Sequence, residues 1–203
     1  TLCVSSQVGC KMGCKFCATG TLGELGNLTS GEILEQLIHA NRINDVPIRN
    51  VVFMGMGEPL NNYNNVVDAV RMMTSVRGFG LGFKHVTVST VGVVPRMEQL
   101  TVDLPQISMA LSLHAPTQEL RAEIVPAARG WKMDRLMAAL DEHVKVTGRA
   151  ALIQYILLAG LNDTEAMGEV LAKLLHGRRV KLNLIPYNPV QSLSTIVQML
   201  AVF

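Results

Sequence analysis

Residues 10–17 read CKMGCKFC, a C-x3-C-x2-C spacing formed by Cys10, Cys14 and Cys17. Three thiolates can hold three irons of a cubane cluster and leave the fourth iron without a protein ligand. An iron with an open position can bind a substrate, whereas a cluster closed by four cysteines normally only transfers electrons. Gly13 suits the tight backbone path that a loop around one cluster needs. The stretch therefore predicts an iron–sulfur cluster with one iron open to a ligand.

Two other interpretations of these cysteines, a zinc site and disulfides, have less support in the sequence. A zinc site usually pairs its ligands as C-x2-C and needs a second pair farther along the chain. Only Cys3 remains here, and no cysteine follows Cys17. Disulfides form in oxidising compartments, and because all four cysteines lie within the first 17 residues, disulfides between them could crosslink only that segment. The spacing thus favours the cluster over zinc or disulfides.

The composition is that of one well-buried domain. The chain has 203 residues, of which 49% are hydrophobic and 17% charged, so it can bury a substantial core. A net charge of +2 neither favours nor excludes nucleic acid, while 4% aromatic residues argue against a base-stacking platform. No run has the pattern of a membrane span or a signal peptide. We expect a cytoplasmic protein, or one of an organelle in a eukaryote, with no membrane partner.

Short apolar runs bounded by Gly, Pro or Asn recur along the chain. Such continuous runs are typical of parallel strands that are covered by helices. The predicted strands are residues 2–4, 50–54, 85–89, 106–113, 152–157 and 180–185. Repeated strand–helix units predict a parallel α/β sheet, either open and doubly wound or curled as a barrel. Six units would make an incomplete barrel, because the closed form has eight.

Helical patterns lie between these runs. Residues 29–32 read TSGE, a capping box, and apolar residues follow it at helical spacing. Amphipathic patterns predict further helices over 65–73, 133–146 and 164–175, the last of them stopped at Gly177.

Polar residues stand where the predicted strands end, which is where chemistry collects in this kind of fold. The run GMGEP at 55–59 has glycines that let a ligand approach the backbone, and its Glu58 could accept protons from an ammonium group. The alternative for this run is a plain turn. Further strand ends carry Ser89, Ser112, His114 and Asn188.

Three groups of residues have both a structural and a functional interpretation. A single His in an apolar segment, such as His114, is more often a structural or ligand-contacting residue than an acid–base catalyst. Cys3 is either a buried small apolar residue or a nucleophilic thiolate that faces the site. Scattered basic residues usually form a solvated face, and binding of phosphates is the alternative. These basic residues are Lys11, Lys15, Lys84, Arg178, Arg179 and Lys181.

Taken together, these motifs resemble the radical S-adenosylmethionine superfamily, whose hallmark is C-x3-C-x2-C with an aromatic residue before the last cysteine. Within it the chain is similar to the RlmN/Cfr family of RNA adenine methyltransferases. The similarity runs in order from residue 1 to about residue 190. The matching segments are residues 3–10, 54–61, 87–95, 112–116 and 183–189.

The resemblance implies a partial (β/α)6 barrel and two cofactors, a 4Fe-4S cluster and S-adenosylmethionine. Cys10, Cys14 and Cys17 are the implied cluster ligands, and Phe16 would pack near the adenine of S-adenosylmethionine. The residues implied to hold S-adenosylmethionine are Gly57, Glu58, Ser89, Ser112, Leu113, His114 and Asn188. The expected partners are an RNA substrate and an electron donor for the cluster, and we expect a monomer.

The implied reaction transfers a methyl group to carbon 2 of adenine in ribosomal RNA, with transfer RNA as a second substrate. In the family a cysteine near the C-terminus carries the methyl group, and a second cysteine, matched here by Cys3, resolves the protein–RNA adduct. This chain has no cysteine after Cys17. We therefore expect it to bind the cluster and S-adenosylmethionine without completing methyl transfer.

Several alternatives stay open at this point. Attack at carbon 8 of adenine fits the same motifs, as does a truncated, inactive protein that binds the cluster and S-adenosylmethionine. A glycyl-radical activase and a simple electron carrier are more distant candidates, and the activase is disfavoured by the position of Cys3. The expected organisation is a core domain over residues 1–190, followed by a divergent C-terminal tail over 191–203. Gln154 replaces the glutamate that is usual in the family.

Overall fold

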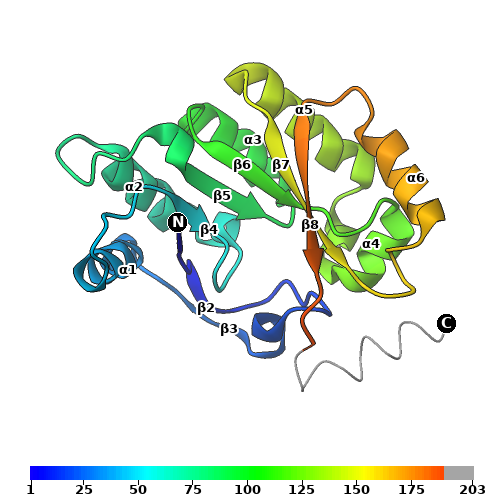
Figure 1. Ribbon diagram of the computed structural model, residues 1–203, viewed down its shortest axis with the longest axis horizontal. Coiled ribbons are helices and arrows are strands. Elements are labelled where there is room, and N and C mark those ends of the chain that lie inside the picture. Colours follow the sequence, from blue (N-terminus) through cyan, green and yellow to red (C-terminus); the bar gives the residue numbers. More distant parts are fainter. Residues whose placement is uncertain (190–203) are drawn as a thin grey trace.

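The computed structural model describes residues 1–189 and contains one six-stranded parallel sheet. Its strands, in spatial order, are β1 (Leu2–Cys3), β4 (Val51–Phe53), β5 (Val86–Thr90), β6 (Ser108–Ser112), β7 (Ala151–Leu157) and β8 (Val180–Pro186). The spatial order equals the chain order, so the sheet has no point at which the winding reverses, as a doubly wound sheet would. The sheet is curled, and of the two architectures left open by the sequence it is the partial barrel (Figure 1).

Right-handed crossovers that always advance in one direction place their helices on one face of a sheet. The α-helices are α1 (Ser30–Ile43), α2 (Tyr63–Thr74), α3 (Val94–Asp103), α4 (Gln118–Ile124), α5 (Met133–Thr147) and α6 (Glu165–Leu175). Short 3-10 helices are η1 (Ala18–Thr21), η2 (Pro59–Asn62), η3 (Phe83–His85) and η4 (Pro126–Gly130). No helix among residues 1–189 is long and apolar enough to cross a membrane.

The two faces of the sheet differ in chemistry because side chains alternate along each strand. In β5, Val86 and Val88 are fully buried in the main hydrophobic core, together with residues of the helices. Thr87 and Ser89, between and after them, line cavities on the other face. The sequence predicted strands covered by helices, and the structure shows such cover on one face only.

The predicted strands and helices are present, with ends shifted by a few residues. The capping box of α1 is complete, since Thr29 Oγ1 accepts a hydrogen bond from the Glu32 amide and the Glu32 carboxylate accepts one from the Thr29 amide. The helices α3 and α4 were not predicted. Of these two helices, α3 has no side-chain cap, and α4, which Thr117 caps by accepting a hydrogen bond from the Leu120 amide, has only 7 residues. The predicted tail over 191–203 lies outside the described residues.

A two-stranded hairpin, β2 (Gln7–Cys10) with β3 (Gly23–Asn27), was also not predicted. Figure 1 shows it on the side of the sheet toward which the arrowhead of β8 points. The strands approach closely, because a Cβ atom on Gly9 would lie 1.9 Å from the carbonyl oxygen of Gly23. Gly9 also has φ +78°, which a residue with a side chain rarely adopts. The hairpin carries the first cysteine of the motif at its end.

Replacement of the α1 cap tests the contribution of the capping box. We expect Thr29→Ala to lower the free energy of unfolding by about 1 kcal/mol, because one amide at the start of the helix loses its partner. Urea denaturation followed by circular dichroism measures this change. A Thr29→Ser variant keeps the hydroxyl and should stay close to wild type, and an equal loss in both variants would contradict the account.

Candidate active site

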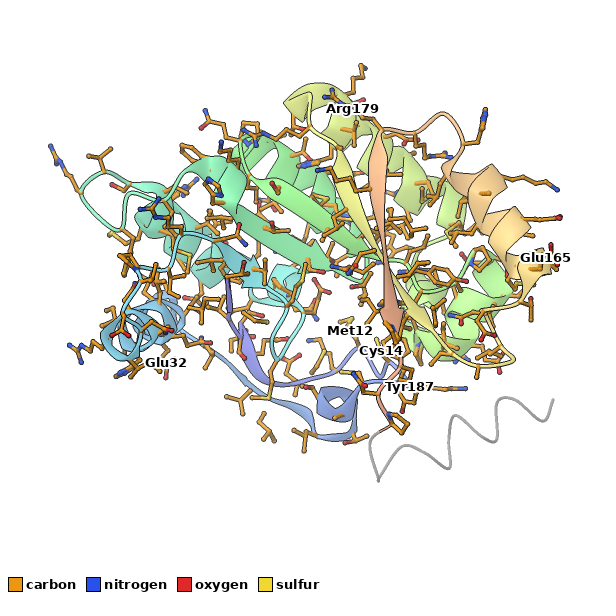
Figure 2. All side chains as sticks on the ribbon, in the orientation of Figure 1. Met12, Cys14, Glu32, Glu165, Arg179 and Tyr187 are labelled. Atoms are coloured by element: carbon orange, nitrogen blue, oxygen red, sulfur yellow. The ribbon has the colours of Figure 1, made fainter. Side chains whose placement is uncertain are left out.

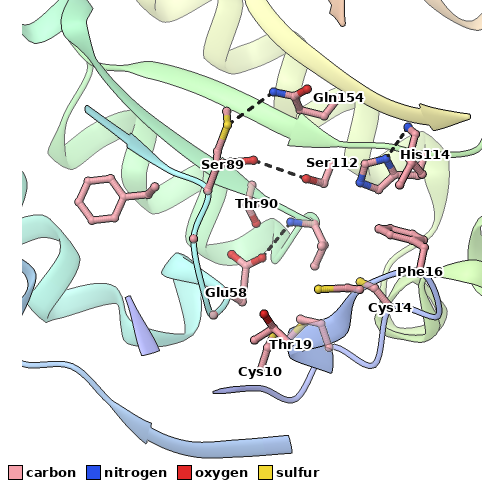
Figure 3. A pocket seen from close by; sticks show the side chains of 18 of the residues that line it. Cys10, Cys14, Phe16, Thr19, Glu58, Ser89, Thr90, Ser112, His114 and Gln154 are labelled. Atoms are coloured by element: carbon pink, nitrogen blue, oxygen red, sulfur yellow. Dashed lines mark hydrogen bonds between the residues drawn. The ribbon is translucent and has the colours of Figure 1, made fainter. Parts of the chain in front are cut away.

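A cavity of about 460 Å³ lies where β4 to β8 end and where the cysteine loop faces the sheet. Figure 3 shows the cysteines on one side of this cavity and Gln154 on the other. The polar and sulfur-bearing lining residues include Cys10, Cys14, Cys17, Thr19, Met54, Glu58, Ser89, Thr90, Ser112, His114, Gln154 and Asn183. The polar residues predicted at the carboxyl ends of the strands therefore line one partly open cavity.

The three cysteines of the motif all line this cavity, and all are free thiols. The loop is held by backbone bonds, from the Cys17 amide to the Cys14 carbonyl (3.1 Å) and from the Lys15 amide to the carbonyl of Ile124 in α4 (2.9 Å). Gly13 adopts φ +67°, the left-handed conformation that its position in the tight loop requires. The loop is thereby fixed against α4, and it continues directly from Cys10 at the end of β2.

Three thiols that line one cavity are a donor set that fits a cubane cluster. Among residues 1–189 no group of three or more His, Cys, Asp or Glu side chains is arranged to hold one metal ion. A cubane binds each thiolate at a different corner, so its ligands surround the cluster and do not converge on one point. Burial, followed by the neighbouring thiols of Cys17 and Cys10, raises the pKa of Cys14 to about 12. Iron would supply the positive charge that stabilises the thiolates.

Glu58 is buried, with 2% of its surface exposed, and joins two strand ends. Its Oε1 accepts a hydrogen bond from the Leu60 amide (3.0 Å) and its Oε2 accepts one from the Val91 amide (2.9 Å). Burial raises the pKa of the carboxyl, and these two amides oppose the rise. The remaining acceptor capacity of the carboxylate is available to a ligand in the cavity.

The glycine before Glu58 is required by close packing within the protein. A Cβ atom on Gly57 would lie 2.6 Å from Gln7 Cβ, and Gly57 has φ +102°. The Glu58 amide donates to Gln7 Oε1 at 2.8 Å, which fixes the turn against β2. From the sequence we expected this glycine to let a ligand approach the backbone. In the structure, the missing side chain instead allows the close contact between Gly57 and Gln7.

Ser89 and Ser112 end neighbouring strands, and their Oγ atoms are 3.4 Å apart. Gln154, on the next strand, accepts a hydrogen bond from Asn183 Nδ2 through Oε1 (2.6 Å) and donates through Nε2 to the sulfur of Met54 (3.7 Å). Four strands, β5 to β8, thus present hydroxyl and amide groups to one cavity. The contribution of Asn183 was missed, although its two-residue spacing from Ile185 on the same strand face could have indicated it.

His114 is the one residue other than glycine with positive φ (61°) among the described residues. Its Nδ1 accepts a hydrogen bond from the Ile156 amide (3.1 Å), so a neutral ring carries its proton on Nε2. Burial, with a smaller contribution from the charge of Arg121, lowers the pKa of His114 from 6.5 to about 3. The ring meets Phe16 edge-on, with centroids 4.7 Å apart. It is a neutral hydrogen-bond donor beside the cysteine loop.

Arg121 was missed by the sequence interpretation, because no motif or periodicity marks it. Its guanidinium is buried, with 1% of the residue exposed. It donates to the backbone carbonyls of Leu113 (3.0 Å), Ser112 (3.1 Å) and Val91. Ser112 is the last residue of β6, Leu113 follows it and Val91 follows β5, so one side chain from α4 joins both strand ends.

Three predicted site residues do not line the cavity. Leu113 is fully buried in the main core and acts there through its backbone. Asn188 is exposed, beyond the end of β8. Cys3 is exposed on the edge strand β1, where its sulfur interacts with the backbone of Met54, a cavity residue. The other predicted residues, Gly57, Glu58, Ser89, Ser112 and His114, are brought together.

Comparison with known proteins agrees with this fold and site. A family model described as the radical SAM superfamily matches residues 4–174. The chain belongs to the radical SAM superfamily. Its structure superposes on a radical SAM methyltransferase from Sphaerobacter thermophilus with a TM-score of 0.89 and 38% identity, covering 98% of this chain and 62% of that one. Streptococcus suis SuiB, at 14% identity and a TM-score of 0.66, shares the fold over 95% of this chain and 43% of its own.

Curated relatives are named as RNA methyltransferases. A probable dual-specificity RNA methyltransferase RlmN from Akkermansia muciniphila is 44% identical over 95% of this chain and 54% of its own length. A dual-specificity RNA methyltransferase RlmN from Alcanivorax borkumensis is 48% identical over 93% of this chain and 52% of its own length. The chain thus spans about half the length of the curated relatives it matches.

The neutral state of His114 has a measurable consequence. Nitrogen chemical shifts of this ring should remain those of neutral imidazole at about pH 5, because its pKa in the folded protein is about 3. The unfolded chain binds the proton at its ordinary 6.5, so the contribution of His114 to stability is complete above 6.5 and is lost as the pH falls toward 3. A charged ring at about pH 5 in the folded protein would contradict this.

Removal of the Arg121 guanidinium should be severe. Arg121→Met leaves three buried carbonyls without their donor, and we expect the free energy of unfolding to fall by at least about 3 kcal/mol. The matched control is Arg135→Met, an exposed side chain near Glu98 (3.9 Å) and Trp131, which should cost about 1 kcal/mol or less. Urea denaturation distinguishes the two, and equal losses would contradict the role of Arg121.

Proposed function

We propose that this chain is the core of a radical S-adenosylmethionine methyltransferase that acts on carbon 2 of adenine in RNA. The observation that carries the proposal is the cavity, which brings the three motif cysteines together with Glu58 and His114. The relatives named as RNA methyltransferases support the substrate class. Ribosomal RNA is the proposed substrate, as in the name of a relative from Nitrosopumilus maritimus, and transfer RNA is the proposed second substrate, in line with the family resemblance.

Cys10, Cys14 and Cys17 would hold a 4Fe-4S cluster through three irons. When bound, the cluster supplies the electron for reductive cleavage of S-adenosylmethionine at the open iron. Glu58 and the hydroxyls of Ser89 and Ser112 provide acceptors for the ammonium and hydroxyl groups of S-adenosylmethionine.

The remaining residues exclude water and fix the ligand. Phe16 and His114 form an edge-to-face pair that closes one wall of the cavity. Because its Nδ1 is occupied, His114 can donate only through Nε2. Asn188, although exposed in this structure, and the backbone of Leu113 complete the proposed set of cofactor residues.

Methyl transfer needs one cysteine that carries the methyl group and another that resolves the adduct. Cys3, beside Met54 at the edge of the site, is the proposed resolving cysteine. The 203 residues contain no cysteine after Cys17 that could carry the methyl group. We therefore propose that residues 1–190 form a core domain that cleaves S-adenosylmethionine but does not by itself methylate RNA. The proposed setting is cytoplasmic and monomeric, with a separate electron donor.

The test is to reconstitute the 203-residue chain with iron and sulfide and to supply a one-electron reductant, S-adenosylmethionine and RNA. We expect 5′-deoxyadenosine to form without any methyladenine, and we expect Cys14→Ala to form none of either. Mass spectrometry of nucleosides after digestion measures both products. Methyladenine from this chain, or no 5′-deoxyadenosine from the reconstituted wild type, would refute the proposal.

A further inference from the structure

Two of the basic residues singled out in the sequence form ion pairs in the structure, whereas Arg179, Lys181 and one residue that the sequence did not single out, Arg149, form none among residues 1–189. Lys11 is paired with Glu24 (3.0 Å), and Arg178 is paired with Asp141 (3.1 Å). Arg179, the neighbour of Arg178, has no carboxylate within ion-pair distance among residues 1–189, and the same holds for Lys181 and Arg149. These three cations are available to an anionic ligand.

Arg149, Arg179 and Lys181 line one cavity of about 460 Å³ at the amino ends of β5 to β8. Arg149 precedes β7 and Arg179 precedes β8, and the Ala151 amide donates to the Arg179 carbonyl, which holds the two segments together. Figure 2 shows Arg179 at the opposite end of the sheet from Cys14. No carboxylate lines this cavity among the described residues. We call the three cations the basic mouth.

We call the cavity lined by Cys10, Cys14 and Cys17 the cysteine cavity. It and the basic mouth both lie along the concave inner face of the half barrel, which we call the trough. The strands β5, β7 and β8 each place one residue in the basic cavity and the residue two positions later in the cysteine cavity. Because residues i and i+2 face the same side of a strand, about 7 Å apart, the two cavities adjoin along the inner face of the half barrel. These pairs are Thr87 and Ser89, Leu152 and Gln154, and Lys181 and Asn183.

The chemistry of the basic mouth selects the ligand class. Its cations are accompanied by the hydroxyls of Thr87 and Ser108, and none of the residues 1–189 that line it is aromatic. Guanidinium, ammonium and hydroxyl groups suit phosphate oxygens, whereas recognition of bases would need aromatic faces for stacking. A phosphate in this mouth would lie at the far end of the trough from the cysteines.

We propose that the basic mouth binds the phosphodiester backbone of the RNA strand next to the target adenosine. This inference rests on the proposed function, since it takes the RNA substrate from there and adds where the strand runs. With the target base in the cysteine cavity, a strand lying along the trough brings a flanking phosphate to Arg149, Arg179 and Lys181. The contact positions the strand and is independent of its sequence.

The test measures binding of a short, labelled single-stranded RNA to the reconstituted chain by fluorescence anisotropy, at low and at physiological salt. Each of Arg149→Gln, Arg179→Gln and Lys181→Gln should weaken binding about threefold, and the triple variant more than about tenfold. The slope of log affinity against log salt should fall by about 0.7 for each phosphate contact removed. Arg178→Gln is the matched control from the same segment and should bind as wild type does.

Three results would overturn the proposal: triple-variant affinity equal to wild type, the same loss in Arg178→Gln, or RNA displacement by polyglutamate at equal charge. Formation of 5′-deoxyadenosine without RNA tests the proposed function alone and should be unchanged in every variant. A parallel loss of that activity in the triple variant would also overturn the proposal, since the basic mouth would then support the site and not the RNA.

Discussion

The site depends on one buried cation, the guanidinium of Arg121. Its N–H groups donate hydrogen bonds to backbone carbonyls where β5 and β6 end. Arg121 belongs to α4, and the carbonyl of Ile124 in the same helix accepts a hydrogen bond from the cysteine loop. No carboxylate forms an ion pair with Arg121 among residues 1–189. Backbone dipoles therefore solvate its charge. Next to these carbonyls the chain turns at His114, with positive φ, and the ring is placed beside Phe16.

The second constraint is the one-directional order of the strands, which leaves the inner face of the sheet without helices. That face carries hydroxyl, amide and cationic side chains that line the two cavities. Its two ends differ in character, with thiols and a buried carboxylate where the strands end and cations where they begin. A polyanionic substrate that presents one base to the cysteines is compatible with this arrangement.

Much of the fold could be predicted because its signals are local. The apolar runs gave the six strands, and the TSGE run gave the start of α1, since both depend on neighbours in the sequence. The hairpin was missed because its signal is not local: the close contact that requires a glycine at position 9 is with Gly23, fourteen positions away in the sequence. Arg121 was missed for the same reason, because its partners become adjacent only after the sheet forms. The motifs identified the three cysteines and five further residues of the cavity, while the exposure of Asn188 depends on packing that they do not describe.

The central claim is that the three cysteines hold a cluster whose open iron binds S-adenosylmethionine. Electron paramagnetic resonance of the reconstituted and reduced chain, recorded with and without S-adenosylmethionine, tests it most directly. The account predicts about four irons per chain and a cluster signal whose g-values change when S-adenosylmethionine is added. A signal that is identical in both samples, or a preparation that retains zinc and no iron, would contradict it.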